Sequence, residues 1–162
     1  MLAQHEERRV PCLRVTADLD AVDRWRARID AAAARCQILQ AALYLGGPAG
    51  ESLDVTAYES ACGASHGVTT LRDWCERWIR VPGDRGLWLG PTLAARLDDD
   101  ARAALEPIAE ATPVGDGLRI ALKDPAHMDA FERALGSLLP SAEDGREASM
   151  ALHAASRGDA RA

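Results

Sequence analysis

The stretch Trp74–Leu97, WCERWIRVPGDRGLWLGPTLAARL, decides the fold of this chain. It holds three of the four tryptophans, and its Pro-Gly and Gly-Pro pairs frame the short apolar run Gly86–Leu89. The tryptophans matter because the chain has few aromatic residues, so leucine, valine, isoleucine and alanine must supply most of the core. The spacing predicts a helix, a turn, a short strand and a further helix.

Strand-like and helix-like segments on both sides of this stretch predict an α+β fold. Ahead of it, Val10–Ala17 and Ile38–Leu45 are strand-like runs, and apolar residues recur at helical spacing from Leu19 to about Arg35. Behind it, two short strands flank Gly115–Gly117, and an amphipathic helix follows them. We expect a ferredoxin-like type of sheet, made of short strands, with helices packed mainly on one face.

Acidic residues mark two predicted helix starts in the second half of the chain. Asp98, Asp99 and Asp100 precede one helical segment, and Asp124-Pro125 precedes another. Three successive carboxylates at a helix start do not converge on one metal ion, whereas the helix dipole favours them without any ligand. We therefore expect these residues to cap helices.

The length of 162 residues fits one domain followed by a tail. Residues 1–140 carry the strong strand and helix signals, and we expect them to form a single α+β domain. Residues 141–162 are polar and rich in alanine, with a weak helical stretch around residues 148–155. This composition predicts a C-terminal tail that is loosely held or is ordered by a partner.

The charge balance favours a protein partner over a nucleic acid or a membrane. The formal net charge is −6, whereas chains that bind nucleic acid through phosphates usually carry a basic face. No run approaches the roughly 20 apolar residues of a membrane span, and the charged start MLAQHEERRV lacks the apolar region of a signal peptide. We expect a cytoplasmic protein, and an acidic chain suits a basic partner protein.

The cysteines predict reduced thiols rather than disulfides. Cys12, Cys36, Cys62 and Cys75 form no CxxC pair, and the expected cytoplasmic location keeps thiols reduced. Cys36 falls on the apolar face of the predicted first helix, where we expect a small buried side chain.

Cys62, His66 and Cys75 are the residues that most resemble a metal or thiol site. Zinc takes three or four cysteine or histidine ligands, and a cysteine beside a histidine can act as a nucleophile. However, the spacing matches no zinc motif, and Cys75 lies on an apolar stripe beside Trp74. We therefore predict no catalytic residue, metal or cofactor, and a small Cys/His metal or thiol protein remains a further alternative.

Trp88, Arg80 and Arg85 form a candidate partner-binding patch. Tryptophan and arginine are enriched among the residues that dominate protein–protein binding energy. The alternative is that the tryptophans are core anchors, which the apolar stripe through Trp74 and Trp78 favours for those two.

Four segments of the C-terminal half resemble one bacterial family. They are Trp88–Pro91, a short helix ending at Leu97, Val114–Ile120 and Phe131–Leu135. In this order they look like the strand-to-helix step, helix, hairpin and closing helix of bacterial type VI secretion immunity family proteins. The resemblance implies a non-enzymatic protein that neutralises a toxin by binding it. It carries over no catalytic residues, and it implies a structural role for Trp88.

The function expected from the sequence is that of a non-enzymatic protein-binding module, an immunity protein if the resemblance holds. The alternative is an accessory or adaptor subunit of a larger bacterial assembly, which would dock through residues 141–162. Both functions require another protein as the partner, and neither needs a cofactor.

Overall fold

The computed structural model describes residues 19–44, 62–64 and 66–159, and the chain divides into two compact units. Among the described residues, one unit contains 62–64, 66–81 and 140–159, and the other contains 19–44 and 82–139. We call them the helical unit and the sheet unit. In this division residues 142–159 group with the helical unit, whereas the sequence predicts a boundary at residue 140. The single domain of residues 1–140 and the separate tail of residues 141–162 stay predictions.

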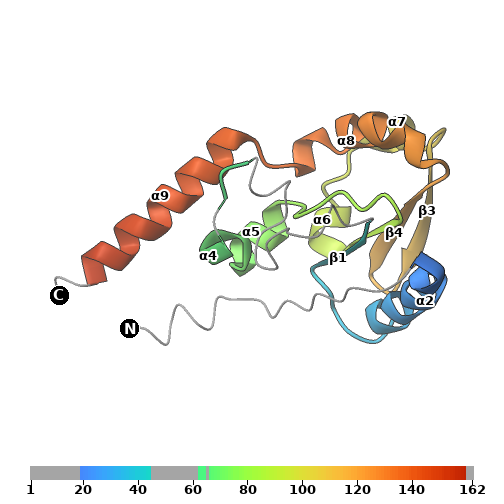
Figure 1. The fold of residues 1–162 in the computed structure, drawn as a ribbon, viewed down its shortest axis with the longest axis horizontal. Coiled ribbons are helices and arrows are strands. Elements are labelled where there is room, and N and C mark those ends of the chain that lie inside the picture. Colours follow the sequence, from blue (N-terminus) through green and yellow to red (C-terminus); the bar gives the residue numbers. More distant parts are fainter. Residues whose placement is uncertain (1–18, 45–61, 65, 160–162) are drawn as a thin grey trace. The chain divides into compact units, whose positions relative to one another are not determined.

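The sheet unit is built on a four-stranded antiparallel sheet with the strand order β1-β2-β4-β3 (Figure 1). The strands are β1 (Gln40–Leu43), β2 (Gly86–Leu89), β3 (Ala109–Val114) and β4 (Gly117–Leu122). Together with the helices, this sheet confirms the α+β class. The predicted strand at Gly86–Leu89 is confirmed to the residue, since its turn signals are local.

The order of the described strands differs from the ferredoxin-like arrangement. In that arrangement, two consecutive strands joined by a helix lie parallel with a third strand between them. Here β1 and β2 are direct neighbours and run antiparallel, as do the other two described pairs. The predicted strand Val10–Ala17 lies outside the described residues.

Both faces of the sheet are covered at β2. Leu87 and Leu89 point to one face and Trp88 to the other, because successive side chains of a strand alternate. All three are at most 1% exposed. The helices of this unit are α2 (Val22–Ala33), α6 (Pro91–Ala94), α7 (Asp99–Leu105) and α8 (Met128–Ala134), with 3-10 turns at Leu19–Ala21, Pro125–His127 and Gly136–Leu138. Helix α2 lies on the Trp88 face, since Asp30 of α2 accepts a hydrogen bond from the Trp88 indole.

The two predicted acidic caps are confirmed. The Asp98 carboxylate accepts a hydrogen bond of 2.8 Å from the backbone N–H of Ala101 at the start of α7. The Asp124 carboxylate accepts a hydrogen bond of 2.9 Å from the backbone N–H of Ala126, where the 3-10 turn leads into α8. Both carboxylates satisfy an N–H group that has no partner within the helix.

The helical unit contains α4 (His66–Thr69), α5 (Arg72–Arg77) and α9 (Ala142–Asp159). Its core joins Ala64, Val68, Trp74 and Trp78 to the partly buried Leu71, Ala148 and Leu152. The Trp74 and Trp78 ring centroids are 6.2 Å apart, so these two tryptophans are core anchors. The segment that the sequence predicts to be a tail thus forms an 18-residue helix that contributes to this core.

Helix α9 begins with a capping interaction between Ser141 and Asp144. The Ser141 backbone N–H and hydroxyl donate to Asp144 Oδ2 at 2.9 and 2.6 Å, and the Asp144 N–H donates to Ser141 Oγ at 3.2 Å. The hydrogen bond from the Ser141 side chain is the main cause that lowers the pKa of Asp144, followed by that from the Ser141 backbone.

We expect this cap to weaken in acid. Because the folded-state pKa of Asp144 is lowered, its stabilisation is complete above the unfolded-state value of about 4 and is lost as the pH falls through the folded-state value. Asp144→Asn should lower the free energy of unfolding by about 0.5–1 kcal/mol at pH 7 and reduce its dependence on pH below about 4. Urea unfolding at pH 7 and pH 3 measures both effects. Glu143→Gln, an exposed carboxyl in the same turn, is the control, and equal pH profiles for Asp144→Asn and the unmodified protein would contradict the prediction.

Candidate interaction site

Trp88 lies in the interior of the sheet unit. Its indole is 1% exposed, and its Nε1 donates to Asp30 Oδ1 at 2.8 Å. Arg119, opposite Trp88 on β4, donates to Asp30 Oδ2 at 2.5 Å and to Thr112 Oγ1 at 3.3 Å. An indole buried to this extent presents no surface to a partner. The structure therefore gives Trp88 the role of an anchor between α2 and the sheet, which is the alternative that the sequence left open.

The two arginines of the predicted patch are each engaged within their own unit. Arg85 precedes β2 in the sheet unit, its Nε lies 3.5 Å from Asp84 Oδ2, and its backbone carbonyl accepts a hydrogen bond from Arg26. Arg80 belongs to the helical unit, and its Nη2 donates to Thr69 Oγ1 at 3.5 Å. Both side chains are partly buried.

Cys62 and Cys75 are buried thiols that donate to backbone carbonyls. Cys62 Sγ lies 3.1 Å from Pro140 O, and Cys75 Sγ lies 3.2 Å from Thr69 O. Reactive cysteines usually lie in partly exposed, electropositive surroundings, whereas these two side chains are 7% and 2% exposed. His66 begins α4, but its side chain is outside what the structure describes, as is Cys12. Within the described ranges, no group of three or more histidine, cysteine, aspartate or glutamate residues could hold a metal ion.

Cys36 is exposed, so its predicted burial on a helix face is wrong. Helix α2 ends at Ala33, and the N–H groups of Arg35 and Cys36 both bond to the carbonyl of Ala32. The chain turns at this point, which carries Cys36 away from the face that the sequence spacing assigned to it.

A different tryptophan–arginine pair lies on α2. The Arg28 guanidinium carbon is 4.9 Å from the centroid of the Trp25 ring. Trp25 is partly exposed and Arg28 is exposed, while Arg26 and Asp30 of the same helix bond to the β2 region. In the sequence, Trp25 is one of the apolar residues that recur at helical spacing between Leu19 and about Arg35. The signal for a surface pair was the three-residue spacing from Trp25 to Arg28, which brings the two side chains together on a helix.

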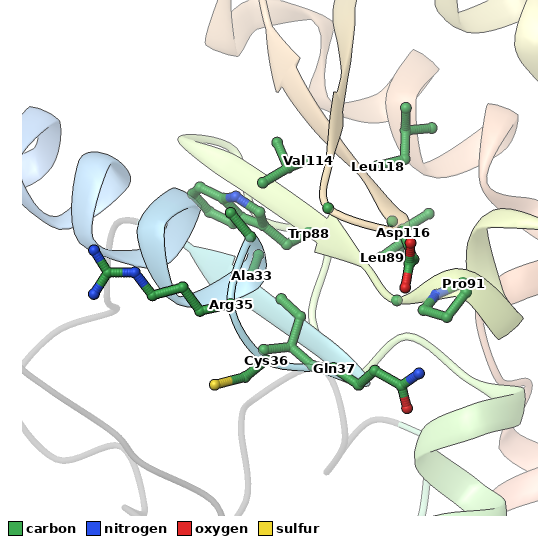
Figure 2. A pocket seen from close by; sticks show the side chains of 15 residues that line it. Ala33, Arg35, Cys36, Gln37, Trp88, Leu89, Pro91, Val114, Asp116 and Leu118 are labelled. Atoms are coloured by element: carbon green, nitrogen blue, oxygen red, sulfur yellow. The ribbon is translucent and has the colours of Figure 1, made fainter.

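A cavity of about 160 Å³ lies at the C-terminal end of α2 (Figure 2). Three segments line it: residues 33–38 after the helix, residues 88–91 at the end of β2, and residues 114–118 at the tip of the β3–β4 hairpin. Glycine lets these backbones meet. A Cβ on Gly115, whose φ is +57°, would lie 2.5 Å from Ala33 O, and a Cβ on Gly117 would lie 2.3 Å from Leu89 O.

Comparisons with protein families, curated proteins and solved structures found no match to this chain. Of the helices that the structure describes, none combines the length and the apolar character needed to cross a membrane.

Proposed function

We propose that the protein is a non-enzymatic protein-binding module that neutralises a cognate bacterial toxin by binding it. The observation that carries the proposal is the stacked Trp25–Arg28 pair on α2. Tryptophan and arginine are the residue types most enriched at binding hot spots, where a large aromatic surface and a charged group are desolvated together. The net charge of −6 supports a basic partner, and the resemblance of the C-terminal half to immunity proteins supports the toxin as its class.

The anchoring of α2 supports the same proposal. Asp30 joins the helix to Trp88 and Arg119, and Arg26 donates to the Arg85 carbonyl at 3.2 Å. These bonds connect the helix to β2 and β4, so Trp25 is presented on a helix that is already in place. Less conformational entropy is lost when a partner binds a surface that is ordered beforehand.

The test is a Trp25→Ala variant measured against the products of the adjacent genes. Each product is co-purified with the chain and the affinity is determined by calorimetry. We expect one partner to bind, and Trp25→Ala to weaken its binding by about thirtyfold or more, since hot-spot truncation costs about 2 kcal/mol or more. Arg24→Ala, an exposed change on the same helix, is the control and should have little effect.

Neutralisation is tested separately from binding. Production of the partner alone should arrest growth, and co-production of this chain should restore it, less effectively for Trp25→Ala. Thermal melting of each variant shows whether the fold is retained. A partner that binds Trp25→Ala and the unmodified chain equally well contradicts the proposed surface, and a bound partner that is harmless contradicts toxin neutralisation.

A further inference from the structure

We infer that the cavity at the C-terminal end of α2 receives the guanidinium group of an arginine side chain. The inference rests on the proposed function for the source of that arginine, which is the partner protein. Its chemistry rests on the cavity alone, namely on the charges, the size and the hydrogen-bonding groups of the three segments that line it.

The cavity lies at the negative end of α2. The summed peptide dipoles of a helix place about half a negative charge at its C-terminal end. The cavity lining begins at Ala33, the last residue of α2. The close approach of Gly115 to Ala33 O places this helix end directly against the hairpin tip.

The carboxylate of Asp116, the other residue of that tip, adds negative charge to the lining. Figure 2 shows it among the lining side chains, near Pro91. Asp116 is exposed, and in the described part of the chain its carboxylate has neither a hydrogen bond nor an ion pair. A carboxylate beside a helix C-terminus makes this rim favourable to a cation and unfavourable to an anion.

Neither Arg35 nor Pro91 supplies the cavity with a group that attracts an anion. Arg35 belongs to the lining segment, but Figure 2 shows its side chain extending away from the other labelled side chains. Pro91 occupies the first position of α6 and has no backbone N–H to donate. The net electrostatic preference of the cavity is therefore for positive charge.

The size of the cavity selects a side chain over a larger ligand. Sites for drug-sized molecules are about 300–1,000 Å³, whereas this cavity is about 160 Å³. That volume suits the head group of one long side chain. A guanidinium is planar and carries five N–H donors, so it can bond to both oxygens of Asp116 and still donate to a carbonyl of the rim.

The experiment is a titration of the full chain followed by amide NMR, with N-acetyl-arginine amide as the probe. N-acetyl-citrulline amide is its neutral counterpart of nearly equal shape. We expect saturable shifts at Gly115, Asp116, Gly117 and Gln37 with the arginine probe and not with citrulline. Asp116→Asn should lower the affinity for the arginine probe by about threefold or more, as expected for an exposed ion pair. Asp129→Asn, an exposed carboxylate on α8, should leave its affinity unchanged.

The outcomes separate this inference from the proposed function. No saturable shift, equal shifts with citrulline, or an unchanged affinity of Asp116→Asn overturns the arginine site. A partner complex that weakens with Trp25→Ala but not with Asp116→Asn also overturns it, and leaves the proposed function intact. Probe binding that depends on Asp116, without any partner complex, supports the site and overturns the proposed function.

Discussion

Replacing Trp88 by alanine is expected to lower the free energy of unfolding of the sheet unit by about 3–5 kcal/mol. The side chain is 1% exposed, so its removal leaves a void among packed atoms that can relax only in part. It also removes the donor to Asp30 Oδ1 and leaves that oxygen in a partly buried position without its bond. Both losses act where α2 joins the sheet, and we expect α2 to detach first.

Two further variants separate packing from hydrogen bonding. Trp88→Phe keeps most of the apolar contact but lacks the N–H donor, and should cost about 1–3 kcal/mol. Trp25→Ala removes an indole that is only partly buried and should cost less than Trp88→Ala. Urea unfolding followed by circular dichroism gives the three values. If Trp88→Ala costs no more than Trp25→Ala, Trp88 does not hold α2 to the sheet.

Trp88 shows which features of the fold can be predicted from the sequence and which cannot. The strand containing Trp88 follows from turn signals a few residues away, so local chemistry was sufficient to predict it. Whether the Trp88 face is covered depends on Asp30, which lies 58 positions earlier in the chain. An alternating pattern over four residues says that Trp88 faces away from Leu87 and Leu89, but both faces of a strand can be buried. The predicted partner patch therefore centred on a residue of the core.

The same limit applies to the order of the strands and to the cavity. Strand order is decided by pairings between distant segments, and periodicity within one segment carries no information about them. The cavity is formed by the end of α2, the end of β2 and the hairpin tip, which are separate turn signals in the sequence. The glycines were visible as turn residues, but the backbones they bring together were not.

The sequence predicts only a weak helical stretch where the 18-residue helix α9 forms, for a related reason. Its apolar residues are sparse, and Gly145 weakens its intrinsic helix propensity by about 1 kcal/mol relative to alanine. In the structure Ala148 and Leu152 pack against the core around Val68 and Trp74, which a composition of the last 22 residues cannot reveal. Helices in proteins gain most of their stability from such packing rather than from propensity.

Gly145→Ala is a direct test of this packing, because helix propensity predicts a higher free energy of unfolding and the tertiary contacts predict a lower one. A Cβ at position 145 would lie 1.9 Å from Cys62 O and 3.0 Å from Ala64 N, so it would meet backbone atoms that no side-chain rotation can move. The propensity gain of about 1 kcal/mol is smaller than the overpacking penalty of a site closed by backbone. Because the opposed atoms are backbone, the penalty should lie near the upper end of the usual range of about 1–3 kcal/mol, so we expect a net loss of about 2 kcal/mol in the free energy of unfolding of the helical unit.

Gly136→Ala is the matched control, since a Cβ at Gly136 would meet no atom within 4 Å. Its effect on stability should stay within about 0.5 kcal/mol.

Thiol labelling in a Cys12→Ser, Cys36→Ser background supplies a local readout. Cys62 donates to Pro140 O next to the start of α9, and Gly145→Ala should speed its modification because the helix start must move away from it. Cys75, 2% exposed, should stay slow and so report that the rest of the unit is intact. If Gly145→Ala changes neither the stability nor the rate of Cys62 labelling, α9 is not packed against the backbone of residues 62–64. Its position then does not depend on the absence of a side chain at residue 145.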